Sequence, residues 1–158
     1  MTKTLSVDLT YVAPLERVTA MLADPAFREQ VCDAQKATSR SVASTGIPGR
    51  IDVTMTQPTQ GVPAFAQKLV GTEVKIERHE TWSSPAAATL TIGAGVSAAR
   101  INGTFALFEE AGRTTQAVRL SIDVKLPLVG GRLESLVQDL MSTAFAKEQR
   151  VGQRYLAG

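Results

Sequence analysis

The sequence has very few of the residues that build disulfide bonds and metal centres. It contains one cysteine, Cys32, and one histidine, His79, in 158 residues. A single cysteine excludes a disulfide framework within the chain. One cysteine and one histidine together also exclude zinc sites of the finger, ribbon or three-histidine type. We therefore expect no metal ion and no cofactor.

Long hydrophobic runs and an excess of one charge are also missing. No stretch approaches the roughly 18 apolar residues of a membrane span, and Asp8 interrupts the N-terminal segment where a signal peptide would be continuously apolar. These patterns predict a cytoplasmic protein without stable membrane insertion. The net charge is only +2, from 17 basic and 15 acidic residues. The basic residues are scattered, which predicts no nucleic-acid partner.

Hydrophobic periodicity predicts one α+β domain over residues 1–158. Alternation from Leu5 to Tyr11 predicts a strand. Pro14 and the pair Asp24-Pro25 then predict the starts of two short helices, with Asp24 as an N-cap. After these helices, hydrophobic residues alternate with a period of two. This pattern predicts a meander of antiparallel strands at 36–44, 51–56, 72–82, 88–92, 101–107 and 118–126. The segment 57–69 contains Pro58, Gly61 and Pro63 and is predicted to be a loop.

After Gly130-Gly131 the period changes to that of a helix. One apolar stripe collects Leu133, Leu136, Val137, Leu140, Met141, Ala144, Phe145 and Val151. A helix of about 25 residues is about 38 Å long. Its apolar stripe needs an extended partner, and the sheet is the only candidate.

This order of elements resembles the START-like (SRPBCC, helix-grip) superfamily, which includes birch-pollen allergens and polyketide cyclases. Within it, the chain is similar to an uncharacterised actinobacterial family. The residues that carry the resemblance are Tyr11, Pro14 and Val18; Asp24, Pro25, Phe27 and Arg28; Val62, Pro63, Phe65 and Gly71; and Pro127-Leu128-Val129-Gly130-Gly131 with Leu133 and Glu134. The resemblance implies a curved antiparallel sheet of about seven strands around a long C-terminal helix, with a cavity between them. It also implies an apolar ligand such as a lipid, a sterol or a polyketide.

The sequence offers no catalytic constellation. His79 lies on the wholly polar parity of its strand and is expected to face water. Cys32 is either a small core residue or a partly exposed thiol. No histidine is expected nearby to activate it as a nucleophile. We therefore predict no catalytic residues.

The opposite parity of the strand 72–82 places Arg78 and Glu80 in line with Val74 and Ile76. Two charges on a concave face are costly unless they are paired or hydrated. One interpretation is a polar floor in an apolar cavity that orients a ligand. The other, which the sequence favours, is that this end of the strand lies beyond the helix, or that a bulge reverses the parity, so that both charges reach solvent.

Parity and helical spacing give the remaining pocket candidates. With Arg78 and Glu80, the set is Met55, Ile76, Leu90, Ile101, Phe105, Leu120 and Ile122 from the sheet, and Leu140, Met141 and Phe145 from the helix. For each of these apolar residues the sequence favours packed core over a pocket wall. Val62 and Phe65 in the segment 57–69 are candidates for a lid over the cavity, or for packing of that segment on its own domain.

Three functions are compatible with these patterns. The first is a module that binds a small hydrophobic or amphipathic ligand between the sheet and the C-terminal helix. The second is an enzyme of the polyketide cyclase or aromatase type that uses Arg78, Glu80 and Tyr11. The third is a protein-interaction domain whose cavity is filled by its own side chains. The sequence favours the first and leaves the ligand and the oligomeric state open.

Overall fold

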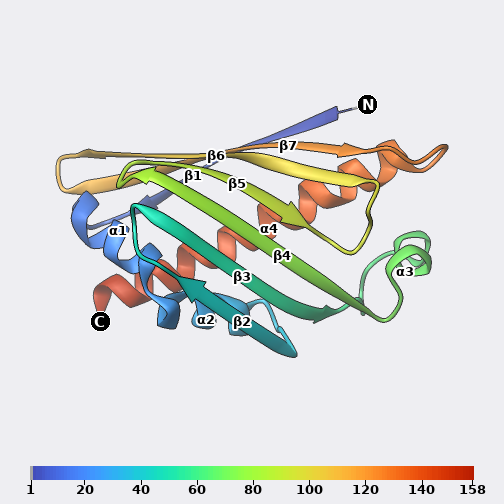
Figure 1. Ribbon diagram of the computed structural model, residues 1–158, viewed down its shortest axis with the longest axis horizontal. Coiled ribbons are helices and arrows are strands. Elements are labelled where there is room, and N and C mark those ends of the chain that lie inside the picture. The colour runs from blue at the N-terminus through green and yellow to red at the C-terminus, as the bar shows by residue number, and fades with distance from the viewer. Residues whose placement is uncertain (1) are drawn as a thin grey trace.

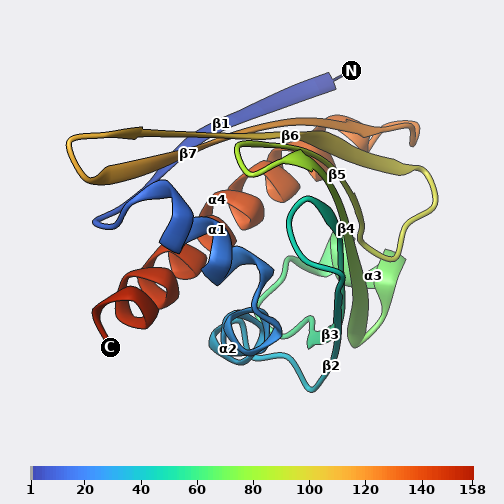
Figure 2. The ribbon, with the colours of Figure 1, turned by 60° about the vertical axis from the view of Figure 1, so that its left-hand side comes forward.

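The computed structural model describes residues 2–158, which form seven strands and four helices. All neighbouring strands are antiparallel, in one sheet of order β1-β7-β6-β5-β4-β3-β2. The sheet curves, and the C-terminal helix lies across its concave face (Figure 1 and Figure 2). The strands are β1 (Thr2–Tyr11), β2 (Ser39–Ser44), β3 (Gly49–Pro58), β4 (Glu73–Ser84), β5 (Ala87–Gly93), β6 (Ala99–Glu110) and β7 (Arg113–Val124).

Two short helices connect the two edges of the sheet. They are α1 (Leu15–Ala23) and α2 (Pro25–Ala34), which follow edge strand β1 and lead to edge strand β2. The predicted N-cap is confirmed, because the Asp24 side chain accepts a hydrogen bond of 2.9 Å from the backbone N–H of Ala26. With Pro25 at the first helical position, this cap ends α1 and starts α2 in a new direction.

Alternation places one face of the strands β1, β6 and β7 largely in the core. In β7 every second residue from Thr114 to Val124 is buried, and the partner strands β1 and β6 repeat the pattern. Gly103 in β6 permits close approach of the two strands, because a Cβ there would overlap the backbone of Arg119. A residue with a side chain would not fit at this position without a shift of the backbone.

The C-terminal helix α4 (Gly130–Ala157) has 28 residues, slightly more than predicted. Its stripe is confirmed at Leu133, Phe145 and Val151, which are buried against the sheet. Leu140 differs, because 44% of it is exposed. None of the helices within residues 2–158 is both long enough and apolar enough to cross a membrane.

The prediction of a loop over 57–69 was wrong in part. β3 continues to Pro58, and a short helix, α3 (Ala64–Val70), follows Pro63. Proline fixes the backbone for a first helical turn, and the residues after it are good helix formers. Gly71, with φ of +83°, ends the helix in a conformation that favours glycine. The last strand also ends earlier than predicted, at Val124.

Candidate ligand-binding cavity

A cavity of about 340 Å³ lies between the sheet and the first two thirds of α4. Its walls come from β3, β4 and the end of β5 on one side and from α4 on the other, while α2 and α3 contribute at its ends. Along α4 the lining residues run from Leu133 to Glu148, about 22 Å at the usual helical rise.

Most of the cavity wall is aliphatic. The sheet contributes Val53, Met55, Val74, Ile76 and Ile92, and α4 contributes Leu136, Val137, Leu140, Met141 and Ala144. Leu69 of α3 and Leu140 of α4 also line the cavity and are partly exposed, at 42% and 44%. The cavity therefore opens to solvent between α3 and α4. An apolar wall with a few polar groups is typical of small-molecule sites.

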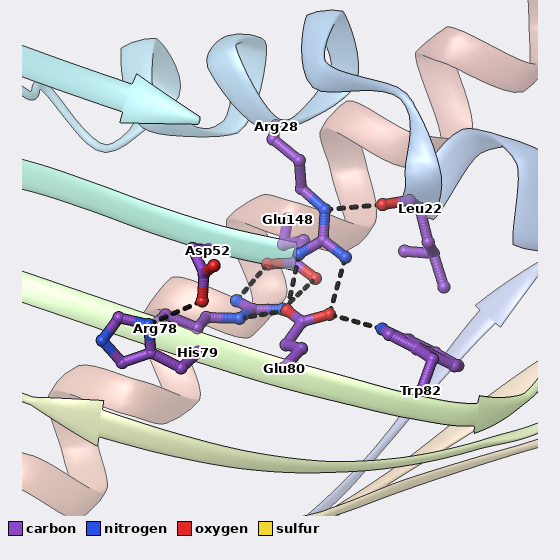
Figure 3. A network of polar contacts seen from close by, with 8 residues as sticks. All are labelled: Leu22, Arg28, Asp52, Arg78, His79, Glu80, Trp82 and Glu148. Carbon is purple, nitrogen blue, oxygen red and sulfur yellow. Dashed lines mark hydrogen bonds and ion pairs between the residues drawn. The ribbon is translucent and has the colours of Figure 1, made fainter. Parts of the chain in front are cut away.

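A network of four charged side chains forms the other end of the cavity (Figure 3). Arg28 of α2 donates two hydrogen bonds to Glu80 of β4, at 2.7 and 2.8 Å. Arg78 donates from Nε to Glu80 at 2.7 Å and from its two Nη atoms to Glu148 of α4 at 2.8 and 3.3 Å. These charge-assisted bonds join a helix, a strand and the long helix at one point.

The network is held by neutral groups as well. Trp82 donates its indole N–H to Glu80 at 2.9 Å, and Arg28 donates from Nε to the carbonyl oxygen of Leu22 at 2.8 Å. The Arg78 guanidinium lies 5.3 Å from the ring centre of Phe105 and 5.4 Å from that of Phe145. Cation–π contacts of this kind favour the charged guanidinium.

The electrostatics keep Glu80 and Arg78 charged. Burial alone would raise the pKa of Glu80, but the charges of Arg28 and Arg78 outweigh burial and lower that pKa to about 2. Burial alone would lower the pKa of Arg78, and the adjacent Glu148 and Glu80 instead raise it above its usual range. Two cations and two anions then give the network no net charge.

The structure corrects the expectation that Arg78 and Glu80 reach solvent. Glu80 is fully buried, and the Arg78 side chain is 14% exposed. The expected bulge does occur in β4, but it lies between Trp82 and Ser84, after both charges, and does not reverse their parity. The physical reason is that Arg28 and Glu148 supply partners from two helices, so neither charge is left uncompensated inside.

The predicted pocket residues fall into two groups. Those that line the cavity are Met55, Ile76, Arg78, Leu140, Met141, Phe145 and, from the lid candidates, Val62. Those outside its wall are Glu80, Leu90, Ile101, Phe105, Leu120, Ile122 and Phe65. The five apolar sheet residues of the second group are at most 3% exposed. They belong to packed core, where Phe105 contacts Trp82 and Phe145 at centroid distances of 5.9 and 6.2 Å.

Sequence reasoning missed two members of the network. Glu148 was detectable, because it falls on the apolar stripe of α4, three residues after Phe145. A charge on such a stripe indicates a buried partner. Arg28 also lies on a buried helix face, three and four residues before Val31 and Cys32 of α2, but only the tertiary fold, which brings α2 over β4, shows that its partner is Glu80. Cys32 also lines the cavity, and burial raises the pKa of its thiol, so it is an uncharged wall residue.

The remaining chemistry-bearing residues lie away from the cavity. His79 is on the outer face of β4, where its side chain is 42% exposed and its Nδ1 lies 2.7 Å from Asp52. Tyr11 is buried in the core, and burial raises the pKa of its hydroxyl far above its usual range. Within residues 2–158 no group of three potential metal ligands occurs.

Several solved structures match this fold over nearly the whole length of the chain. A Thermus thermophilus protein superposes with a TM-score of 0.68 and 21% identity over 98% of each chain. The Zhui aromatase/cyclase of Streptomyces sp. R1128 gives 0.68 and 12%, covering 98% of this chain and 93% of its own. A START superfamily protein of Mycobacterium smegmatis gives 0.61 and 14%, covering 97% and 98%. The chain therefore has the helix-grip, START-like fold.

Within that fold class, the family can be named. The family model described as "Protein of unknown function (DUF2505)" matches residues 6–156, so the chain belongs to this family. Uncharacterised proteins of Mycobacterium bovis and Mycobacterium tuberculosis are 29% identical to it over 114 residues. That match covers 67% of this chain and 66% of each relative.

Proposed function

We propose that this protein binds a small hydrophobic or amphipathic ligand in the cavity between the sheet and α4. The observation that carries the proposal is the cavity itself, about 340 Å³ with a mostly aliphatic wall and a charged group at Arg28, Arg78 and Glu148. Small-molecule sites have this character and begin at about 300 Å³. A domain whose interior is filled by its own side chains would leave no such space, because protein cores pack as densely as organic crystals.

The geometry supports binding better than catalysis by Arg78, Glu80 and Tyr11. A general base near neutral pH needs a raised pKa and a free lone pair facing the substrate. Glu80 has the opposite properties, since its pKa is lowered to about 2 and both its oxygens accept hydrogen bonds. Tyr11 is not part of the cavity wall. The aromatase/cyclase among the structural neighbours shares the fold at 12% identity, which carries no site residue to this chain.

Native mass spectrometry of the purified protein tests the proposal. The expected result is a bound species of a few hundred daltons that is released when the protein is denatured, and that is identified by its mass as a lipid, sterol or polyketide. If only the mass of the chain is seen, a panel of uncharged C12–C18 lipids and sterols is then titrated. No binding across the panel, and none of a fatty acid such as dodecanoate, would overturn the proposed function.

A further inference from the structure

The four-charge network at the end of the cavity restricts which ligand can bind there. We propose that the cavity selects an uncharged amphipathic molecule, with a hydroxyl or carbonyl oxygen against Arg78, over the carboxylate of the same chain length. This inference rests on the proposed ligand-binding function and names the ligand class for that site.

The positive and negative charges of the network balance. Arg28 and Arg78 are matched by Glu80 and Glu148, and each cation is bonded to a carboxylate at 2.7 to 2.8 Å. The side chains of Arg28, Glu80 and Glu148 are at most 3% exposed, so water screens these charges little. A ligand carboxylate at this end would lose its hydrating water, and the network offers no net positive charge to compensate for that loss. It would also approach the carboxylate of Glu148.

Arg78 has more N–H donors than its two carboxylate partners use. A guanidinium has five N–H groups. Within residues 2–158, Arg78 uses three of them, one on Glu80 and two on Glu148. Two N–H groups therefore remain on a side chain that lines the cavity. A neutral oxygen can accept from them without adding charge, and a polar ligand group satisfied in this way avoids the cost of burial.

Outside the network, the charged residue of the cavity wall is Lys147. Lys147 lines the cavity, is partly exposed, and forms no ion pair with another residue of the described chain 2–158. A carboxylate that binds at all is expected at this hydrated lysine and not at Arg78. Substitution of Lys147 therefore distinguishes a carboxylate bound at Lys147 from one bound at Arg78.

The test compares dodecanol with dodecanoate at pH 8, where a carboxyl group of ordinary pKa is ionised. Each is titrated against the uncharged fluorophore N-phenylnaphthylamine bound to the purified protein. Wild type and Lys147→Gln are measured side by side. The expected result is that dodecanol binds at least about tenfold more tightly than dodecanoate to Lys147→Gln. In wild type the preference is the same or smaller.

Glu148→Gln supplies the complementary measurement. It removes one carboxylate and leaves the network with a net charge of +1. We expect the preference to shift toward dodecanoate by about tenfold, whereas the surface control Glu16→Gln leaves it unchanged. If Glu148→Gln does not fold, the comparison between wild type and Lys147→Gln decides alone.

Two results would overturn the inference. Dodecanoate that binds Lys147→Gln as tightly as dodecanol, or more tightly, removes the inference and leaves the ligand-binding function intact. Failure of both molecules and of the uncharged lipid panel removes the function and the inference together. Dodecanoate that binds wild type but not Lys147→Gln supports the inference, because the carboxylate is then held at the lysine.

Discussion

Arg28 links the charge network to α2. It is 3% exposed, and its guanidinium holds Glu80 with two bonds and Leu22 with a third. Removing one partner of a buried ion pair leaves the other charge uncompensated, which costs about 3–5 kcal/mol.

We therefore predict that Arg28→Met lowers the free energy of unfolding by about 3–5 kcal/mol, as measured by urea denaturation. Arg40→Met is the matched control. Arg40 also pairs with carboxylates, but its side chain is 38% exposed, so its loss should cost at most about 1 kcal/mol. Equal costs for the two substitutions would show that the Arg28 pair is not buried as described.

Glu80 gives the network a pH dependence of known sign. Its pKa is about 2 in the folded protein, below the ordinary value of 4.5. A lowered folded-state pKa contributes stability above the ordinary value, and that stability is lost as the pH falls towards the folded-state value. The contribution should therefore disappear between about pH 5 and pH 2.

The measurement is the unfolding free energy of wild type and Glu80→Gln across this pH range. The difference between them should shrink on the order of 3 kcal/mol from pH 5 to pH 2. The difference between wild type and the surface variant Glu16→Gln serves as the baseline. A wild-type advantage over Glu80→Gln that stays constant down to pH 2 would contradict the lowered pKa.

At the scale of elements, α4 packs closely on β1 at a glycine. A Cβ on Gly152 would lie 2.5 Å from Cε1 of Tyr11 and 3.1 Å from Cε of Met21, and both side chains are fully buried. Gly152→Ala should therefore destabilise the protein by about 1–3 kcal/mol, although alanine favours helices. A Cβ on Gly131, also in α4, would meet no atom within 4 Å, so Gly131→Ala should be neutral or stabilising. Urea denaturation that ranks the two substitutions in reverse would refute this close contact.

The short helix α3 is the element whose role the sequence left open. Phe65 stacks under Arg132 of α4, with the guanidinium 4.0 Å from the ring centre, and packs with a small second cluster that includes Ala66 and Leu133. These contacts support packing of the segment on its own domain. They also place α3 at the cavity opening, so its action as a lid stays a prediction.

If α3 acts as a lid, Phe65→Asp should raise the dissociation rate of a bound fluorophore several-fold in stopped-flow experiments. The melting temperature of the variant should fall by less than about 10 °C, because a loss of about 1 kcal/mol in unfolding free energy lowers the melting temperature by a few degrees in a domain of this length. Phe108→Asp, at an exposed phenylalanine of β6, should change neither quantity. A larger loss of melting temperature with an unchanged rate would show that Phe65 serves packing alone.

At the scale of the whole molecule, most of the fold follows from periodicity. The alternation in strands such as β7 and the apolar stripe of α4 reflect which side chains are buried. Buried positions carry apolar residues, so the sequence marks them one by one. The cavity depends on spaces between elements, which no single segment records. Leu120 and Ile122 therefore face the same side of the sheet as the residues that line the cavity, yet they pack in the core, and the sequence does not distinguish the two groups.

The charge network shows the same limit. Glu148 is visible as a charge on an apolar stripe, but its partner Arg78 is chosen by the way α4 crosses β4. Arg28 enters only because the cap at Asp24 turns α2 over the end of the sheet. The sequence can therefore indicate that a charge is buried, and the fold decides which opposite charge balances it.

The central claim, that the cavity between the sheet and α4 binds a ligand, is tested most directly by filling it. Ala144 lines the cavity, whereas Ala146, two residues later on α4, is exposed to solvent. Dodecanol titrations of folded Ala144→Phe and Ala146→Phe should show at least about a tenfold loss of affinity for the first and wild-type affinity for the second. Wild-type affinity in a folded Ala144→Phe would contradict the claim.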